Sequence, residues 1–216
     1  LKQGIKNILT PVSSWVDEIE ICFSGGEPFF SPNLLELIRY LNGWKKVKRL
    51  MFTTNGTVVN LNLLNKIKKD IDNVQISLEG GEKINDEIRG SGIFNQVKKN
   101  IPIFKNLGWR VGINMTIHKL NYKEIPEVIN FCIESKVDTF AVTRLVPSGS
   151  NKKVLNKLLL SKKEIKDIYS FLLNESRYNK KINFSFNRTL WNCLDKEIGR
   201  PCSVGINGVA ILADGT

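Results

Sequence analysis

The chain alternates repeatedly between stretches with the two-residue period of a β-strand and stretches with the 3.6-residue period of a helix. Strand-like apolar segments occupy residues 19–24, 48–53, 74–78, 111–117 and 139–143. Helix-like segments follow near residues 34–41, 60–69, 94–107 and 123–135, and a last helix is expected from Ser161, where Glu164 completes a capping box. Strands that are separated by helices pair in parallel through right-handed crossovers. The sequence therefore predicts an α/β fold.

Some of these strands are apolar on one face and polar on the other. Residues 74–79 and 111–116 both alternate in this way. Strands of a flat parallel sheet that is covered by helices should be apolar on both faces, whereas a barrel-like sheet turns one face to its lumen. A polar lumen indicates water or a ligand. We therefore expect a partial, incomplete TIM-like barrel of parallel strands and helices.

The predicted strands end in polar residues. These are Ser24, Asn55, Ser77, Asn114 and Arg144, each at or near the C-terminal end of its strand. Any one of them is typical of an ordinary turn. In parallel α/β sheets and barrels, however, the C-terminal ends of the strands form the ligand-binding edge. The series therefore predicts a binding site at that edge.

The first strand runs into the segment Gly25-Gly26-Glu27-Pro28. Paired glycines let the backbone turn sharply and approach a ligand without an intervening Cβ, and Pro28 stiffens the exit. A carboxylate beside bare backbone suits a small molecule that carries an ammonium group. The alternative is a tight strand-to-helix turn with a solvated Glu27. The next helix is expected to have Ser31 as its N-cap and Pro32 as its first residue.

The formal net charge of +11 raises the question of a nucleic-acid surface. The lysines are scattered over several predicted helices, for example at Lys66, Lys98 and Lys162, and no aromatic residues interleave with a basic stripe. This distribution favours solvated helix faces over nucleic acid as a partner. No apolar run approaches the roughly 20 residues that cross a bilayer, and residues 1–10 lack the apolar core of a signal peptide. A cytoplasmic location is expected.

The cysteines fall into two groups. Cys22 and Cys132 lie in apolar segments, so both are expected to be buried free thiols. Cys193 and Cys202 lie in a polar segment, where metal ligation is favoured over a disulfide because no secretory signal is evident. Two cysteines alone cannot complete a tetrahedral site, and two unligated loop cysteines are the alternative.

Together these segments resemble the motifs of the radical SAM superfamily, in particular of members with a SPASM-type C-terminal extension. Residues 24–28 (SGGEP) resemble the motif that contacts the amino group of S-adenosylmethionine, and residues 53–56 (TTNG) resemble the end of the next strand. Residues 76–80 (ISLEG) resemble an "SLDG" end, with Glu79 in place of Asp. Residues 85–90 (NDEIRG) are similar to "HDxIRG", with Asn85 in place of His.

The resemblance implies that S-adenosylmethionine binds at the strand ends. Gly25, Gly26 and Glu27 would hold its ammonium group. Ser77 and Asn114 would face the ribose and the carboxylate. Arg144 would contact the carboxylate or pair with Glu79. The predicted cofactor-binding residues are Ser24, Gly25, Gly26, Glu27, Asn55, Ser77, Asn114 and Arg144.

A second resemblance concerns the end of the chain. The spacing of Cys202 and Gly215 resembles the opening of a SPASM pattern, and Cys193 resembles an upstream cysteine of that region. The resemblance implies that Cys193 and Cys202 are metal ligands of an auxiliary 4Fe–4S cluster. It divides the chain into a radical SAM core at 1–150, a helical connector at 151–190 and the start of the SPASM region at 191–216.

The chain departs from the family at its front. The CxxxCxxC triplet that binds the catalytic 4Fe–4S cluster is absent from the sequence. Residues 1–10 resemble the tail of the helix before the first strand, so we expect the first βα unit of the barrel to be missing. We also expect that the chain as it stands cannot build the catalytic cluster.

The resemblance implies an enzyme that cleaves S-adenosylmethionine reductively and abstracts a hydrogen atom from a substrate. Relatives with SPASM extensions suggest a peptide or protein substrate, and an electron donor such as flavodoxin or ferredoxin. Two alternatives stay open: an enzyme of cofactor biosynthesis that acts on a small molecule, and an inactive remnant that serves as a binding module. His118 is expected to have a surface or strand-cap role.

Overall fold

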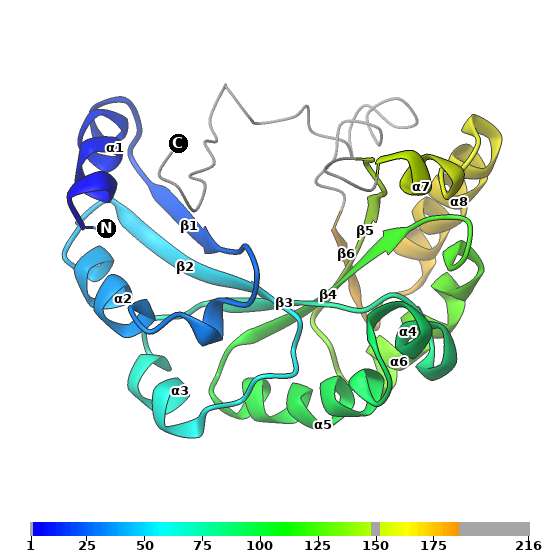
Figure 1. Ribbon diagram of the computed structural model, residues 1–216, viewed down its shortest axis with the longest axis horizontal. Helices are drawn as coiled ribbons and strands as arrows, with labels where there is room; N and C mark the ends of the chain where they lie inside the picture. Colours follow the sequence, from blue (N-terminus) through cyan, green and yellow to red (C-terminus); the bar gives the residue numbers. More distant parts are fainter. Residues whose placement is uncertain (1, 148–151, 186–216) are drawn as a thin grey trace.

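The computed structural model describes residues 2–147 and 152–185. Its centre is a parallel sheet whose six strands pair in sequence order. The strands are β1 (Ile19–Phe23), β2 (Val47–Thr54), β3 (Asn73–Ser77), β4 (Arg110–Ile117), β5 (Thr139–Arg144) and β6 (Asn183–Ser185). The sheet curves into an open arc in which β1 does not pair with β6 (Figure 1). The prediction of an α/β fold with an incomplete, TIM-like barrel is confirmed.

Helices follow most of the strands. They are α1 (Lys2–Trp15), α2 (Leu34–Asn42), α3 (Leu61–Ile67), α4 (Glu82–Arg89), α5 (Ile93–Asn106), α6 (Ile125–Glu134), α7 (Lys152–Lys157) and α8 (Lys162–Tyr178), with 3-10 turns η1 (Pro28–Phe30) and η2 (Tyr122–Glu124). Figure 1 shows α2, α3, α5 and α6 along the outer side of the arc. Within the described part of the chain, no helix combines the length and apolar character that crossing a membrane requires.

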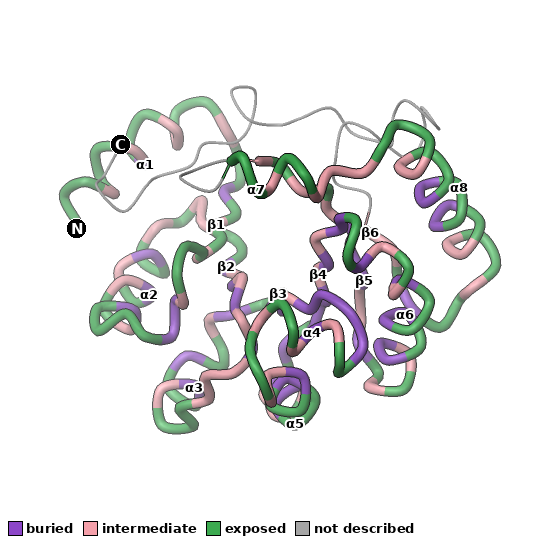
Figure 2. The backbone as a smooth tube through the Cα atoms, turned by 45° about the vertical axis from the view of Figure 1, so that its right-hand side comes forward, coloured by how far each residue is buried: buried purple, intermediate pink, exposed green. Residues whose placement is uncertain are grey.

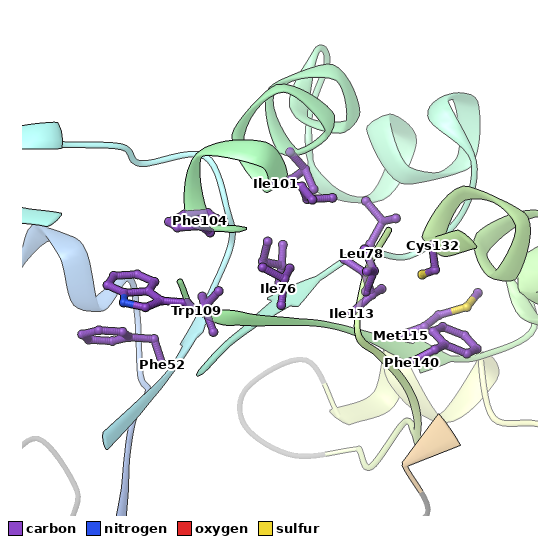
Figure 3. Packing of buried hydrophobic residues seen from close by; sticks show 14 of the residues in the cluster. Phe52, Ile76, Leu78, Ile101, Phe104, Trp109, Ile113, Met115, Cys132 and Phe140 are labelled. Carbon is purple, nitrogen blue, oxygen red and sulfur yellow. The ribbon is translucent and has the colours of Figure 1, made fainter. Parts of the chain in front are cut away.

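The hydrophobic core lies between the outer face of the sheet and these helices. Ile76 of β3 and Ile113 of β4 are fully buried, as are Ile101 and Phe104 of α5. Figure 3 shows Ile76 projecting from the sheet towards these two α5 residues. Burial alternates along β3, in which Val74 and Ile76 are buried and the polar residues beside them are only partly so. Figure 2 shows buried segments in the sheet and in helices such as α5 and α6. The predicted division into an apolar and a polar face is thus present.

Several elements differ from the expectation. Helix α2 has Asn33 rather than Ser31 as its N-cap, because Ser31 ends the 3-10 turn that begins at Pro28. Helices α4 and α7 and strand β6 were not predicted. Strand β6 spans only three residues, which is too short for a periodic pattern. Helix α8 does begin after Ser161, and both hydrogen bonds of its capping box are present.

The two described cysteines differ in environment. Cys132 of α6 is fully buried, as predicted, and burial raises the pKa of its thiol well above the usual range. The expectation that Cys22 is buried is wrong: Cys22 is exposed, and its Sγ lies 3.5 Å from Thr53 Oγ1 on the neighbouring strand. Burial alternates along β1, and Cys22 is one of its exposed positions although its neighbours in sequence are apolar.

One buried polar residue connects the core to the C-terminal edge of the sheet. The Asn100 side chain of α5 donates hydrogen bonds from Nδ2 to the carbonyl oxygens of Gly56 at 2.9 Å and Thr57 at 3.3 Å. These residues form the loop that follows β2. Helix α5 therefore holds this loop in position relative to the sheet.

Replacing Asn100 by Ala should lower the free energy of unfolding by about 1–3 kcal/mol, because the buried Gly56 carbonyl and the partly buried Thr57 carbonyl lose their donor. Urea unfolding measures the effect. The matched control is Gln96→Ala, an exposed residue on the same helix, which should change stability by less than about 0.5 kcal/mol. Equal effects in the two variants would contradict the role of Asn100.

Candidate functional site

The turn after β1 leaves its backbone open. Ser24, Gly25 and Gly26 are all exposed. Gly25 has a φ of 120°, which disfavours any other residue. Gly26 has no such requirement, and a Cβ built on either glycine meets no protein atom within 4 Å. Nothing in the described protein explains glycine at position 26, so the open space beside it suits the close approach of a ligand.

The Glu27 carboxylate joins the ends of β1 and β2. Its Oε1 accepts hydrogen bonds from Thr54 Oγ1 at 2.7 Å and from the Phe29 amide at 3.3 Å. Its Oε2 accepts one from the Asn55 amide at 2.8 Å. Glu27 is therefore not the solvated residue of a simple turn. It places the glycine turn next to the end of β2, and buried Thr54 is a contributor that sequence reasoning missed.

Asn55 begins the loop after β2. Its Oδ1 accepts hydrogen bonds from the Thr57 amide at 2.8 Å and the Thr57 hydroxyl at 2.7 Å. Because an amide N–H can only donate, this contact assigns the side-chain oxygen towards Thr57 and leaves Nδ2 directed elsewhere. Gly56 follows with a φ of 74°, and a Cβ there would lie 2.5 Å from Ile76 Cγ2. This glycine, unlike Gly26, is required by the fold.

The ends of β3, β4 and β5 bring a row of polar side chains together. Ser77 pairs in register with Asn114. Asn114 Nδ2 donates to Thr143 Oγ1 at 3.4 Å, and Thr143 Oγ1 lies 3.2 Å from Thr116 Oγ1. Ser77 and Asn114, both predicted, are thus neighbours. Thr116 and Thr143 belong to the same row, and their alternation with apolar residues was the signal that could have found them.

Arg144 lies apart from this row. It ends β5 and is exposed, and because successive side chains of a strand leave opposite faces, it does not share the face of Thr143. The alternative that Arg144 pairs with Glu79 is wrong. Glu79 Oε1 accepts a hydrogen bond from Arg89 Nη2 at 2.5 Å, and its Oε2 accepts one from the Thr116 amide at 2.9 Å.

The segment that resembles "HDxIRG" has a structural explanation. Buried Asn85 accepts a hydrogen bond from the Glu79 amide through Oδ1 at 3.0 Å. The Asp86 carboxylate accepts hydrogen bonds from the amides of Gly92 at 2.5 Å and Phe94 at 2.8 Å, at the start of α5. Helices α4 and α5 are joined in this way, and Arg89 at the end of α4 is directed to the sheet.

His118 follows β4 and is 7 % exposed. Its Nδ1 accepts a hydrogen bond from the Leu120 amide at 3.2 Å, and its own amide donates to Asn121 Oδ1 at 2.8 Å. Burial lowers the pKa of His118, and the Glu79 charge opposes this effect. The strand-cap role is confirmed, whereas the surface position is not.

The described residues include no group of three or more His, Cys, Asp or Glu side chains that could hold a metal ion. Cys193 and Cys202, the predicted ligands of an auxiliary cluster, lie outside the described residues. Besides the Glu27 carboxylate, the described part of the site offers open backbone, hydroxyls and amides. Such groups can hold and orient an organic ligand.

The curved parallel sheet defines an α/β protein with an open, incomplete barrel. Residues 16–132 match the radical SAM superfamily. The chain belongs to this superfamily.

Curated relatives include enzymes of different kinds. The chain is 31% identical over 159 residues to Fe-coproporphyrin III synthase of Methanosarcina barkeri, covering 73% of this chain and 39% of that protein. It is 26% identical over 167 residues to the mycofactocin maturase MftC of Mycolicibacterium smegmatis, covering 73% of this chain and 42% of that protein. The chain thus spans about two fifths of the length of these relatives.

Solved structures share the fold. Streptococcus suis SuiB bound to S-adenosylmethionine aligns with a TM-score of 0.69 at 21% identity, over 91% of this chain and 45% of SuiB. The anSMEcpe structure with bound AdoMet and a Cp18Cys peptide aligns with a TM-score of 0.70 at 19% identity, over 96% of this chain and 60% of that one. At these identities the likeness concerns the fold.

The contribution of the α4–α5 connection to folding stability should depend on pH in the acidic range. The hydrogen bond from the Phe94 amide, and then the one from Gly92, lower the pKa of Asp86. The ionised carboxylate therefore stabilises the fold above its ordinary pKa of about 4, and this contribution is lost as the pH falls through the lower folded-state pKa.

The substitution Asp86→Asn removes this titration. The difference in urea midpoint between wild type and variant should be largest near pH 7 and shrink towards about pH 3. Glu87→Gln is the control, since Glu87 is exposed on the same helix and accepts no side-chain hydrogen bond within the described residues. A constant difference between wild type and Asp86→Asn across this range would contradict the assignment.

Proposed function

We propose that this chain provides the S-adenosylmethionine-binding part of a radical SAM enzyme that abstracts a hydrogen atom from a peptide or protein substrate. Membership of the superfamily supports the reaction class. The observation that carries the binding role is the exposed Gly25-Gly26 backbone, where a Cβ would point into open space. Glu27 holds this backbone beside the end of β2.

The described residues fit S-adenosylmethionine. The backbone of Gly25 and Gly26, oriented by Glu27, would hold the ammonium group. Hydroxyl and amide groups of Ser77 and Asn114 would bind the ribose and the carboxylate. Ser24 and Asn55 flank these contacts, and Arg144 stays a prediction for the carboxylate. When bound and reduced through an iron–sulfur cluster, S-adenosylmethionine supplies a 5′-deoxyadenosyl radical.

The described residues do not fit a catalytic 4Fe–4S cluster, because no set of thiolate ligands converges among them. The sequence also lacks the CxxxCxxC triplet. We therefore propose that this chain alone binds S-adenosylmethionine without cleaving it. Cys193 and Cys202 stay the proposed ligands of an auxiliary cluster, and flavodoxin or ferredoxin the proposed electron donor.

The inference of a substrate class is supported by relatives of two kinds. Similarity to MftC, a maturase, and to SuiB bound to its precursor peptide SuiA supports a peptide substrate. Similarity to Fe-coproporphyrin III synthase and pre-heme d1 synthase favours a second candidate, an enzyme that acts on a small molecule in cofactor biosynthesis. The peptide is our first candidate, because SuiB and anSMEcpe align over most of this chain and were both solved with peptides.

Gly26→Ala should weaken binding of S-adenosylmethionine at least about tenfold, equivalent to about 1.4 kcal/mol. Its free energy of unfolding should stay within about 0.5 kcal/mol of wild type, because neither φ nor packing requires glycine there. Equilibrium dialysis and urea unfolding of the anaerobically reconstituted full-length protein measure the two quantities.

The glycine Gly108 provides the matched control. It has a φ of 88° and open space around its Cβ position, at the far end of the sheet before β4. Gly108→Ala should lower stability by about 1 kcal/mol and leave S-adenosylmethionine binding unchanged. Unaltered binding in Gly26→Ala would refute the proposed cradle.

The proposed reaction is tested by measuring the formation of 5′-deoxyadenosine. The full-length protein is reconstituted with iron and sulfide under anaerobic conditions, reduced, and supplied with S-adenosylmethionine. We expect 5′-deoxyadenosine from the full-length protein and none from residues 1–216 alone. A bound cluster without any product in the full-length protein would refute the activity, and product from residues 1–216 would refute the proposed need for ligands outside this sequence.

A further inference from the structure

A cleft of about 440 Å³ lies beside the proposed cofactor site. It is lined by Asn55, Thr57, Ile88, Arg89 and Ile93. The first two belong to the loop after β2, and the others to the end of α4 and the start of α5. None of the residues with proposed S-adenosylmethionine contacts lines it except Asn55. The cleft is therefore adjacent to that site and separate from most of it.

Arg89 is held in a fixed direction at this cleft. Its Nη2 donates to Glu79 Oε1, and Glu79 in turn accepts the Thr116 amide of β4. The Glu79 side chain is 5% exposed, whereas that of Arg89 is 26% exposed. Glu79 lies two residues beyond Ser77 in the sequence. The guanidinium is thus anchored just outside the strand ends, with part of its surface accessible.

The cleft is rich in hydrogen-bond donors. Asn55 uses its oxygen for Thr57, so its Nδ2 is available as a donor. The Arg89 guanidinium has five N–H groups, of which one is used by Glu79. Its Nε is buried and has no partner among the described residues.

The described lining of the cleft carries positive charge only. Arg89 is the only charged residue among the described residues that line the cleft. Two nearby carboxylates bind groups of the protein: Glu79 accepts a hydrogen bond from Arg89, and Asp86 accepts two amides of the α4–α5 joint. Glu87, two residues before Arg89, is exposed and does not line the cleft. The net charge of +11 adds a long-range attraction for anions.

We propose that this cleft is a substrate subsite that binds a carboxylate group. Arg89 and Asn55 Nδ2 donate to the two oxygens, and Ile88 and Ile93 contact the carbon chain that bears them. Charge-assisted hydrogen bonds from a preoriented guanidinium suit a carboxylate. The identification of the ligand as substrate rests on the proposed function. The carboxylate can come from an acidic peptide side chain or from a small-molecule acid.

The test observes Arg89 directly. The full chain is labelled with [15N]arginine, and the Nε–H resonance of Arg89 is followed by NMR during titration. The probes are N-acetyl-glutamate amide, its neutral isostere N-acetyl-glutamine amide, and glutarate. We expect saturable shifts with the acidic probes and none with the glutamine probe. Tighter binding of N-acetyl-glutamate amide than of glutarate indicates a peptide source, and the reverse order indicates a small molecule.

Variants separate binding from a merely structural role. Glu79→Gln removes the internal counter-charge of Arg89, so the acidic probe should bind several-fold tighter. The double variant Glu79→Gln/Arg89→Gln removes both charges, leaves no unpaired buried carboxylate, and should bind at least about tenfold more weakly. Arg110→Gln is the charge-matched control, since Arg110 is exposed at the opposite end of the sheet. It should bind like wild type.

Three results would overturn the proposal. They are equal binding of the glutamate and glutamine probes, weaker binding by Glu79→Gln, and displacement of the acidic probe by S-adenosylmethionine, which would assign the cleft to the cofactor's own carboxylate. Asn55→Asp keeps the side-chain acceptor for Thr57 and adds a negative charge. This variant should therefore bind the acidic probe more weakly and stay folded. The readout requires no S-adenosylmethionine cleavage, so failure of the proposed reaction leaves this result interpretable.

Discussion

Pairing of the six strands in sequence order is the constraint on which the rest of this structure depends. All strands point the same way, so every strand ends at one edge, and the polar residues after successive strands meet there although they are far apart in sequence. Ser77 faces Asn114 for this reason. Carboxylates then fix neighbouring strands against each other by accepting backbone amides. Glu27 accepts the Asn55 amide and Glu79 the Thr116 amide at the C-terminal edge, while Asp138 accepts the Val111 amide at the opposite one.

The acidic residues at the binding edge therefore act on the protein itself. Glu27 accepts hydrogen bonds through both of its oxygens, as do Glu79 and Asp86. The surfaces left open towards a ligand are hydroxyls, amides and bare backbone. This division makes a rim with several carboxylates compatible with the proposed binding of an anionic or zwitterionic molecule.

The residue patterns predicted the elements that are long enough to show a clear period, and they also predicted the polar residues at the ends of the strands. They could not identify the partner of Glu27, because Thr54 lies 27 positions away and looks like an ordinary strand residue. The prediction that Cys22 is buried was wrong because its apolar neighbours indicated a strand buried on both faces. Successive side chains of β1 point to opposite faces of the curved sheet, and Cys22 lies on the open face. Arg89 was noticed within a motif, but only the fold brings it to Glu79. Strand β6 is too short to register as a pattern at all.

The sequential strand order also bears on how the chain acquires its shape. Within the described residues, each strand hydrogen-bonds to the strands directly before and after it along the polypeptide, so each pairing closes one strand-to-strand connection, and none has to span the whole chain. A nascent chain can add one strand and one helix at a time to the part already released from the ribosome. Assembly in the direction of synthesis requires no rearrangement of earlier pairings.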